Sequence, residues 1–170
     1  LEHMKREKAD TLYKEATLIA NTYASDLYNN EASLETVKTQ LDSLSVYLDS
    51  TIWIINPSGR MIMDTATPVD LDHPRIIEGF NATETAGSYY TIGTFYDSFE
   101  GEMLSVYAPI TSNFKVRGYV VIHTAMASLR STSESLLSIS YIILVILFLL
   151  SLIILIFFTE MVYLPLRKIT

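Results

Sequence analysis

The sequence predicts an α+β domain followed by one long helix that becomes a transmembrane span. Three observations support this prediction. Residues 139–158 form a run of twenty residues without a charge, a proline or a glycine. Two amphipathic helical patterns occupy the first fifty residues, and five short segments rich in β-branched and aromatic residues follow them. Helices and strands that are separated along the chain in this way are typical of the α+β class.

The apolar run 139–158 has the length of a membrane span. At about 1.5 Å per residue it extends for roughly 30 Å, which matches the hydrocarbon core of a bilayer. Arg167 and Lys168 follow the run, whereas Arg130 is the only cation in the fifteen residues before it. The positive-inside rule therefore predicts a cytoplasmic C-terminus, with residues 5–130 on the outer side of the membrane.

The composition excludes several classes of function. The net charge of −7 argues against binding to nucleic acid. The absence of cysteine excludes disulfides, thiol catalysis and cysteine-ligated metals, and an extracytoplasmic domain without disulfides fits a bacterial protein. The sequence contains no nucleophile elbow, phosphate-binding glycine loop or HExxH motif. We therefore expect no catalytic residues and no cofactor.

Both ends of the sequence indicate a longer natural protein. Residues 1–4 resemble an expression-vector remnant and are left out of the fold prediction. An N-terminus outside the cytoplasm requires an export signal or an earlier span, so we expect one before Lys5. The expected helix at the C-terminus has no stop signal, so we also expect the chain to continue after Thr170.

Two helices are predicted at the start of the domain. Residues 5–29 carry one apolar stripe, which either packs on the domain core or pairs with a second copy of the chain. Asn29 and Asn30 end this helix. A second helix, 33–48, begins at Ser33, which is a favourable N-cap residue. The stripe residues of the first helix are Leu12, Ala16, Ile19, Tyr23 and Leu27, and those of the second are Leu34, Val37, Leu41, Leu44 and Leu48.

Five strands are predicted after the helices. Segments 51–56 and 60–64 flank a Pro-Ser-Gly turn and form a hairpin. A short helix is expected at 73–79, because Asp72 caps it, Pro74 lies in its first turn and Gly79 ends it. Short connections then predict an antiparallel meander of three strands. The strands of this meander are 89–96, 103–110 and 115–124.

The last strand has two different faces. Val116, Gly118, Val120 and Ile122 share one face, which is apolar enough to pack on helices. The opposite face holds Arg117, Tyr119, Val121 and His123, and suits a partly wet pocket. From Met126 the sequence has no proline or glycine before Pro165. One continuous helix is therefore expected to leave the sheet, with residues 131–162 as stalk and span.

Three motifs carry a resemblance to a known family. They are IWIINPSGRMIMDT at 52–65, MLSVYAPI at 103–110 and GYVVI at 118–122. In this order the motifs resemble the extracytoplasmic PAS-like sensor domains, called Cache or PDC domains, of bacterial sensor histidine kinases. The resemblance covers residues 5–130. It implies a long N-terminal helix and a five-stranded antiparallel sheet.

The tail carries a second resemblance. Residues 163–170, YLPLRKIT, are similar to the start of a HAMP linker. The two resemblances together imply a homodimeric membrane receptor of a two-component system, with an ATP-dependent protein histidine kinase as its output domain. Chemoreceptors and cyclic-dinucleotide cyclases share this front end and stay as alternatives. A membrane-anchored extracellular interaction protein is a further alternative to the sensor kinase. In each case residues 139–158 would contact the lipid bilayer.

The family resemblance also implies a ligand site. In the family, small ligands lie on the sheet face that the short helix and the following loop cover. Arg75 would hold a carboxylate with two parallel hydrogen bonds, and tyrosine and histidine would supply donors. Alternatively, Arg75 forms a surface ion pair and the tyrosines cover a closed core. The residues placed at this site are Arg75, Tyr89, Tyr90, Tyr107, Tyr119 and His123.

No metal site is predicted. Asp97, Glu100 and Glu102 cluster at a turn, but their spacing is not that of an EF-hand, and a solvated acidic turn explains them better than Ca²⁺ does. The three histidines do not have the spacing of metal ligands. The signal that such a domain senses would be a small molecule, an ion or a protein, and the sequence does not identify it.

Overall fold

The computed structural model describes residues 2–30, 32–82 and 89–169, with side chains up to Leu129 and between 136 and 162. The chain divides into two compact units, residues 1–129 and 130–170, which we describe separately. Its helices are α1 (Glu2–Ile19), η1 (Ala20–Ala24), α2 (Ser25–Tyr28), α3 (Leu34–Leu48) and α4 (Met126–Ile169). Its strands are β1 (Thr51–Ile55), β2 (Met61–Asp64), β3 (Tyr90–Gly93), β4 (Met103–Ser112) and β5 (Lys115–Ala125).

The five strands form one antiparallel sheet with the order β2-β1-β5-β4-β3. The predicted hairpin is β1 and β2, and the predicted meander is β3, β4 and β5. A pairing between β1 and β5 joins them, with a register that runs from Thr51 opposite His123 to Ile55 opposite Tyr119. The expected α+β class and five-stranded sheet are therefore confirmed.

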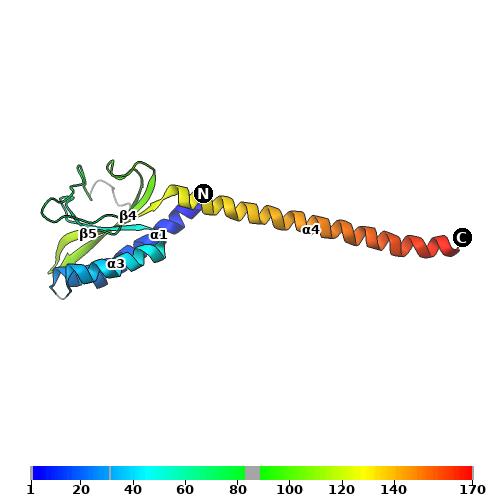
Figure 1. Cartoon of the computed structure of the whole chain (residues 1–170), viewed down its shortest axis with the longest axis horizontal. Helices are drawn as coiled ribbons and strands as arrows, with labels where there is room; N and C mark the ends of the chain where they lie inside the picture. Colours follow the sequence, from blue (N-terminus) through cyan, green and yellow to red (C-terminus); the bar gives the residue numbers. More distant parts are fainter. Residues whose placement is uncertain (1, 31, 83–88, 170) are drawn as a thin grey trace. The chain divides into compact units, whose positions relative to one another are not determined.

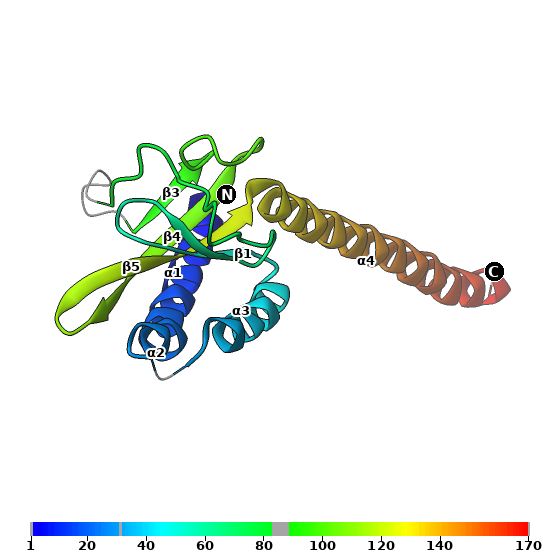
Figure 2. The same ribbon diagram turned by 60° about the vertical axis from the view of Figure 1, so that its left-hand side comes forward.

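One face of the sheet packs against helices, and the other packs against the connections between strands (Figures 1 and 2). Figures 1 and 2 show α1 and α3 together on one face, with the long connections between strands on the other. Val120 and Ile122 of β5 belong to the aliphatic core under the helices, and Val121 belongs to an aromatic core on the opposite face. The predicted alternation along β5 is confirmed.

The first helix contains a π-helical turn that the periodicity did not predict. Leu12, Ala16 and Ile19 are buried, as the predicted stripe requires. After η1, however, Ala20 and Ala24 are buried, while Tyr23 lies only partly buried beside the same core. A π-helical turn needs more than four residues, so it moves the buried face by about one position.

The second helix forms as predicted. The Ser33 hydroxyl accepts a hydrogen bond from the Thr36 backbone N–H at 3.2 Å, which is the expected N-cap. Val37 and Leu41 are buried on its inner face. The helix ends at Asp49, whose left-handed backbone (φ 50°) turns the chain into β1.

The prediction of a short helix at 73–79 is wrong. This segment instead runs alongside the β1–β2 turn, where Ile76 forms an antiparallel bridge with Arg60. The Met61 N–H donates to the Arg75 carbonyl, and the Ile77 N–H donates to the Gly59 carbonyl, both at 2.8 Å. A seven-residue helix would satisfy few of its own backbone groups, whereas this extended arrangement uses the hydrogen bonds that the turn offers.

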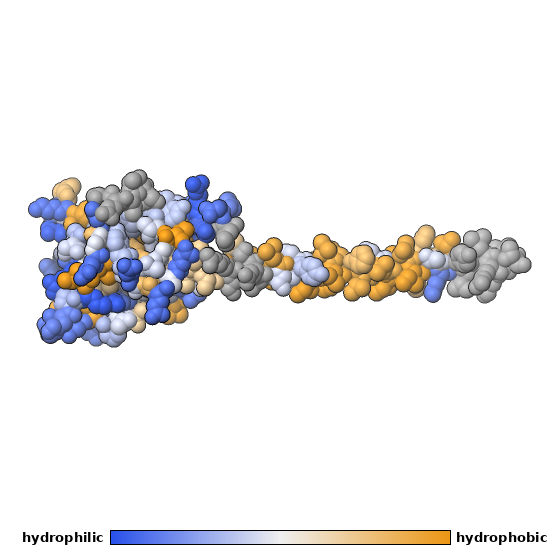
Figure 3. All heavy atoms as spheres, turned by 90° about the horizontal axis from the view of Figure 1, so that it is seen from above, coloured by the Kyte–Doolittle hydropathy of each residue, from blue (hydrophilic) through white to orange (hydrophobic). Residues whose placement is uncertain are grey.

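The helix α4 runs without interruption from Met126 to Ile169. The continuous helix expected over 126–162 is therefore confirmed, and the helix extends beyond it through Pro165. Its segment Leu136–Val162 is the one helix in the described part of the chain that is long and apolar enough to cross a membrane. All large apolar side chains in this segment are exposed, and Figure 3 shows them along most of the helix.

Gly59 provides a test of the contact that replaces the short helix. Its φ of +92° disfavours any side chain, and a Cβ there would lie 2.6 Å from the Ile77 carbonyl oxygen. We expect Gly59→Ala to lower the free energy of unfolding by about 2–4 kcal/mol. The measurement is denaturant unfolding of the whole chain in detergent micelles.

Gly101→Ala is the matched control, because a Cβ at Gly101 meets no atom within 4 Å and its φ is not positive. We expect it to change the free energy of unfolding by less than about 0.5 kcal/mol. Equal effects of the two substitutions would contradict the packing of Ile77 on the turn.

Candidate ligand-binding site

An aromatic cluster lies on the sheet face that the helices leave uncovered. At its centre, the rings of Trp53 and His123 meet edge to face with centroids 4.2 Å apart. The rings of Phe95 and Phe99 each lie 4.7 Å from His123. Phe99 also stacks on Trp53 at 5.3 Å with an angle of 13°. The imidazole of His123 is therefore enclosed by three aromatic rings.

The sheet register brings Trp53 and His123 together. Because Thr51 pairs with His123 and Trp53 pairs with Val121, Trp53 and His123 are diagonal neighbours on one face. Ser105 of β4 is the direct partner of His123 on the other side. Three adjacent strands therefore build the floor of the cluster.

A left-handed turn, residues 94–99, places the other two rings. The expected strand 89–96 ends early, at Gly93, because Phe95, Tyr96 and Asp97 have φ angles of 46°, 53° and 59°. The Ser98 and Phe99 N–H groups both donate to the Thr94 carbonyl, at 3.0 and 3.1 Å. Left-handed backbone costs non-glycine residues about 1–2 kcal/mol each, so this turn is strained. It directs Phe95 and Phe99 against Trp53 and His123.

His123 is a buried, neutral histidine. Its side chain is 0% exposed, its Nδ1 lies 2.6 Å from the Ser105 hydroxyl, and its Nε2 has no hydrogen-bond partner among the described residues. Burial lowers the pKa of His123 to about 3, because an imidazolium here would lose its hydration. The expectation of a partly wet face is therefore wrong around His123. The Trp53 Nε1 is likewise buried without a partner in the part of the chain that the structure describes.

Arg75 lies at the edge of the cluster. Its guanidinium forms an ion pair with the Asp64 carboxylate and lies 5.7 Å from the centre of the Trp53 ring. The Arg75 side chain is 52% exposed, whereas the Asp64 side chain is 2% exposed. Asp64 also accepts a hydrogen bond from the Ala66 N–H at 2.8 Å. The alternative of an ion pair for Arg75 is thus what the structure shows, with a buried partner.

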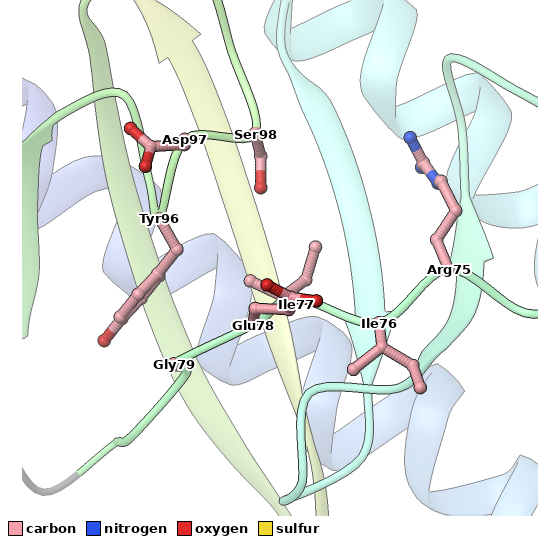
Figure 4. A pocket seen from close by; sticks show the side chains of 8 residues that line it. All are labelled: Arg75, Ile76, Ile77, Glu78, Gly79, Tyr96, Asp97 and Ser98. Carbon is pink, nitrogen blue, oxygen red and sulfur yellow. The ribbon is translucent and has the colours of Figure 1, made fainter.

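An open pocket of about 790 Å³ lies between the segment 75–79 and the turn 94–99. Figure 4 shows Arg75 and Tyr96 on opposite sides of it, with Ile77 and Glu78 between them. Ser98 and Asp97 complete the side formed by the turn. The turn therefore has one side in an open pocket and the other in the aromatic cluster.

The six residues predicted for the ligand site lie on both faces of the sheet. Tyr107 and Tyr119 belong to the aromatic core with the cluster. Tyr89 and Tyr90, in contrast, pack against the aliphatic core under the helices. The Tyr89 hydroxyl donates to the Asp10 carboxylate, which raises the pKa of Tyr89. Arg75, Tyr107, Tyr119 and His123 are brought to one face, and the other two are not.

Sequence reasoning missed the rings that enclose His123. Strand alternation could have placed Trp53 on one face of β1, but not next to His123, because the partner of β1 was unknown. Phe95 and Phe99 were assigned to a strand and a turn, and their sequence shows no glycine to indicate a left-handed backbone. Among the described residues, no group of three or more histidine or acidic side chains is arranged to hold a metal ion.

Comparisons with known proteins show the fold. The chain resembles the extracellular domain of vpHK1S-Z8, a protein named as a histidine kinase, with a TM-score of 0.52 and 14% identity over 77% of this chain and 56% of that one. It also resembles a domain named as a sensory box/GGDEF family protein from Vibrio parahaemolyticus, with a TM-score of 0.51 and 15% identity over 77% of this chain and 59% of that one. This chain therefore spans little more than half of either structure. No model of a known family and no curated protein matches the sequence. The predicted sensor-domain fold is confirmed.

The ion pair between Arg75 and Asp64 makes a prediction about stability. Arg75→Ala leaves a buried carboxylate without its partner, so we expect the free energy of unfolding to fall by about 2–3 kcal/mol. The double variant Arg75→Ala/Asp64→Asn removes the charge and should recover part of this loss. Arg60→Ala is the control, because Arg60 is exposed and the hydrogen bond from its side chain to the Leu71 carbonyl is long, at 3.4 Å. Denaturant unfolding measures all four proteins, and an unaffected Arg75→Ala would contradict the pairing.

The lowered pKa of His123 predicts how the stability of the fold depends on pH. Its folded pKa of about 3 lies below the ordinary value of 6.5, so its contribution to stability is complete above pH 6.5 and is lost as the pH falls towards 3. Between pH 7 and 4.5 we expect this loss to be about 3 kcal/mol. His123→Gln should remove this part of the acid sensitivity, whereas His73→Gln, at an exposed site, should not. Identical pH profiles of the unsubstituted chain and His123→Gln would show that His123 is not buried as a neutral group.

Proposed function

We propose that this chain is the extracytoplasmic sensing and transmembrane transmitting part of a bacterial sensor histidine kinase. The observation that carries the proposal is the direct passage of β5 into α4, at Ala125 and Met126, in a domain with the fold of sensor domains. A strand that forms the floor of the candidate site thus continues into the helix that is apolar enough to enter a membrane.

The membrane placement is supported by the surface of α4. The segment Leu136–Val162 would extend for roughly 40 Å, which exceeds the hydrocarbon core of a bilayer. Its apolar side chains are exposed in the chain alone, and lipid would cover them. With Arg167 and Lys168 in the cytoplasm, residues 5–130 lie outside, and residues 163–170 begin a HAMP-like linker.

Transmission of the signal is supported by the first turn of α4, which belongs to the domain core. Met126 and Leu129 are buried with the aliphatic core, and the Met126 N–H donates to the Glu102 carbonyl at 3.1 Å. A rearrangement of the sheet would therefore displace the start of α4. Couplings of this kind are typically about 1–3 kcal/mol.

The receptor would act as a homodimer, but not through the stripe of the first helix. Leu12, Ala16 and Ile19 are buried within the domain, so they are not free to pair with a second copy. Other surfaces would form the dimer contact, such as the outer side of α1, where Leu18 is 54% exposed.

A cyclic-dinucleotide cyclase is a second candidate output domain, and one structural neighbour supports it. One structural neighbour is named as a sensory box/GGDEF family protein, so the same front end could serve a cyclic-dinucleotide cyclase. The domain would sense the same class of signal in either receptor.

Thermal melting of the whole chain in lipid nanodiscs tests the sensing function. The chain is screened against amino acids, carboxylates, other metabolites and divalent cations. We expect at least one compound to raise the melting temperature in a saturable way, because a ligand that binds only the folded state stabilises it. The shift should be lost in His123→Ala and kept in His73→Ala, whose side chain is exposed. The absence of a shift from every class would favour a protein signal or an interaction protein without a ligand.

A further inference from the structure

Two buried polar atoms in the aromatic cluster have no hydrogen-bond partner among the residues that the structure describes. They are Trp53 Nε1 and His123 Nε2, and both side chains are at most 2% exposed. Their rings lie 4.2 Å apart, on neighbouring strands of a rigid sheet. A buried polar atom without a hydrogen bond is destabilising, so nearly all such atoms in folded proteins have partners. A ring that stacked on Trp53 and met the edge of the His123 ring could supply the hydrogen bond that His123 Nε2 lacks.

The turn 94–99 is the element that closes this place. Phe95, which begins the left-handed part, and Phe99, which ends the turn, contact the Trp53 and His123 rings. Tyr96, Asp97 and Ser98, between them, line the open pocket. Opening this one turn would therefore join the pocket to the buried pair, and would release three non-glycine residues from left-handed backbone.

We propose that the turn 94–99 is a lid over a binding site for a flat, uncharged heteroaromatic ring, which takes the place of Phe99 on Trp53 and forms a hydrogen bond with His123 Nε2. The proposal rests on the sensing function proposed above and names the chemical class of its ligand.

The contacts of the cluster select this class. The ligand is flat because Phe99 already stacks on Trp53 with only 13° between the ring planes. It carries a polar edge because it must supply a hydrogen-bond partner for His123 Nε2. It is uncharged because the walls are aromatic, and the charged group beside Trp53, Arg75, is already paired with Asp64.

The lid makes binding depend on an equilibrium between a closed and an open turn. The ligand binds only the open form, so its apparent affinity is reduced by the small fraction of open molecules. A substitution that disfavours the closed turn should therefore tighten binding even though it destabilises the protein. A residue with a purely structural role would not show this combination.

Fluorescence titration of the whole chain in nanodiscs tests the proposal. Trp53 is the only tryptophan in the sequence, so its emission reports on the site directly. The probes are adenine, uracil and nicotinamide as uncharged polar rings, with benzoate as the charged ring and benzene as the ring without a polar edge. We expect a saturable change with at least one polar ring, and affinities at least about tenfold weaker for benzoate and benzene.

Two variants with one control identify the lid and the hydrogen bond. Asp97→Val places a β-branched residue at a φ of 59°, so it should lower the melting temperature and tighten binding of the polar ring about fivefold. Glu100→Val makes the same change in charge at an exposed neighbour without positive φ, and should leave the affinity unchanged. His123→Phe removes Nε2 and should weaken binding at least about tenfold.

The outcomes separate this proposal from the sensing function. The lid site is overturned if no polar ring gives a saturable change with either the unsubstituted chain or Asp97→Val, or if His123→Phe binds as tightly as the unsubstituted chain. If the melting screen still yields a ligand in that case, the chain is a sensor that uses another site. If neither experiment yields a ligand, small-molecule sensing itself fails.

Discussion

The pairing of β1 with β5 is the contact on which the rest of the domain depends. Without it, the hairpin of β1 and β2 would be separate from the meander, because the chain between β2 and β3 forms no strand among its described residues. The register of this pairing also decides which side chains share a face. A shift by one residue would move Trp53 to the helical side and leave His123 without its aromatic neighbour.

The two faces of the sheet are covered by different kinds of structure. Under the helices, aliphatic side chains fill an ordinary core without strain in the strands. On the other face no helix occurs among the described residues, and a strained turn supplies the covering rings. That face also holds the buried nitrogen atoms Trp53 Nε1 and His123 Nε2, for which the described part of the chain supplies no hydrogen-bond partner. Strain and unsatisfied polar groups at one place indicate a face selected for something other than stability.

The strand β5 links these features to the long apolar helix α4. It pairs with β1 and β4, carries His123 near its end, and passes into α4 within three residues. The first turn of α4 is packed into the aliphatic core on the opposite side of the sheet from His123. One continuous strand therefore joins the aromatic face to the start of α4.

The sequence by itself determined the features that depend on local periodicity. These are the two packed helices, the Ser33 cap, the alternation along β5 and the apolar length of α4, because each follows from side chains a few residues apart. Only the tertiary structure decided the strand order, the extended path of residues 75–77 and the enclosure of His123. The reason is that Trp53 and His123 are seventy residues apart in the chain, and no local pattern reports which strands pair. The same holds for Tyr90, whose face was set by the pairing of β3 with β4, and for Tyr89, which precedes β3 and packs beside the same core.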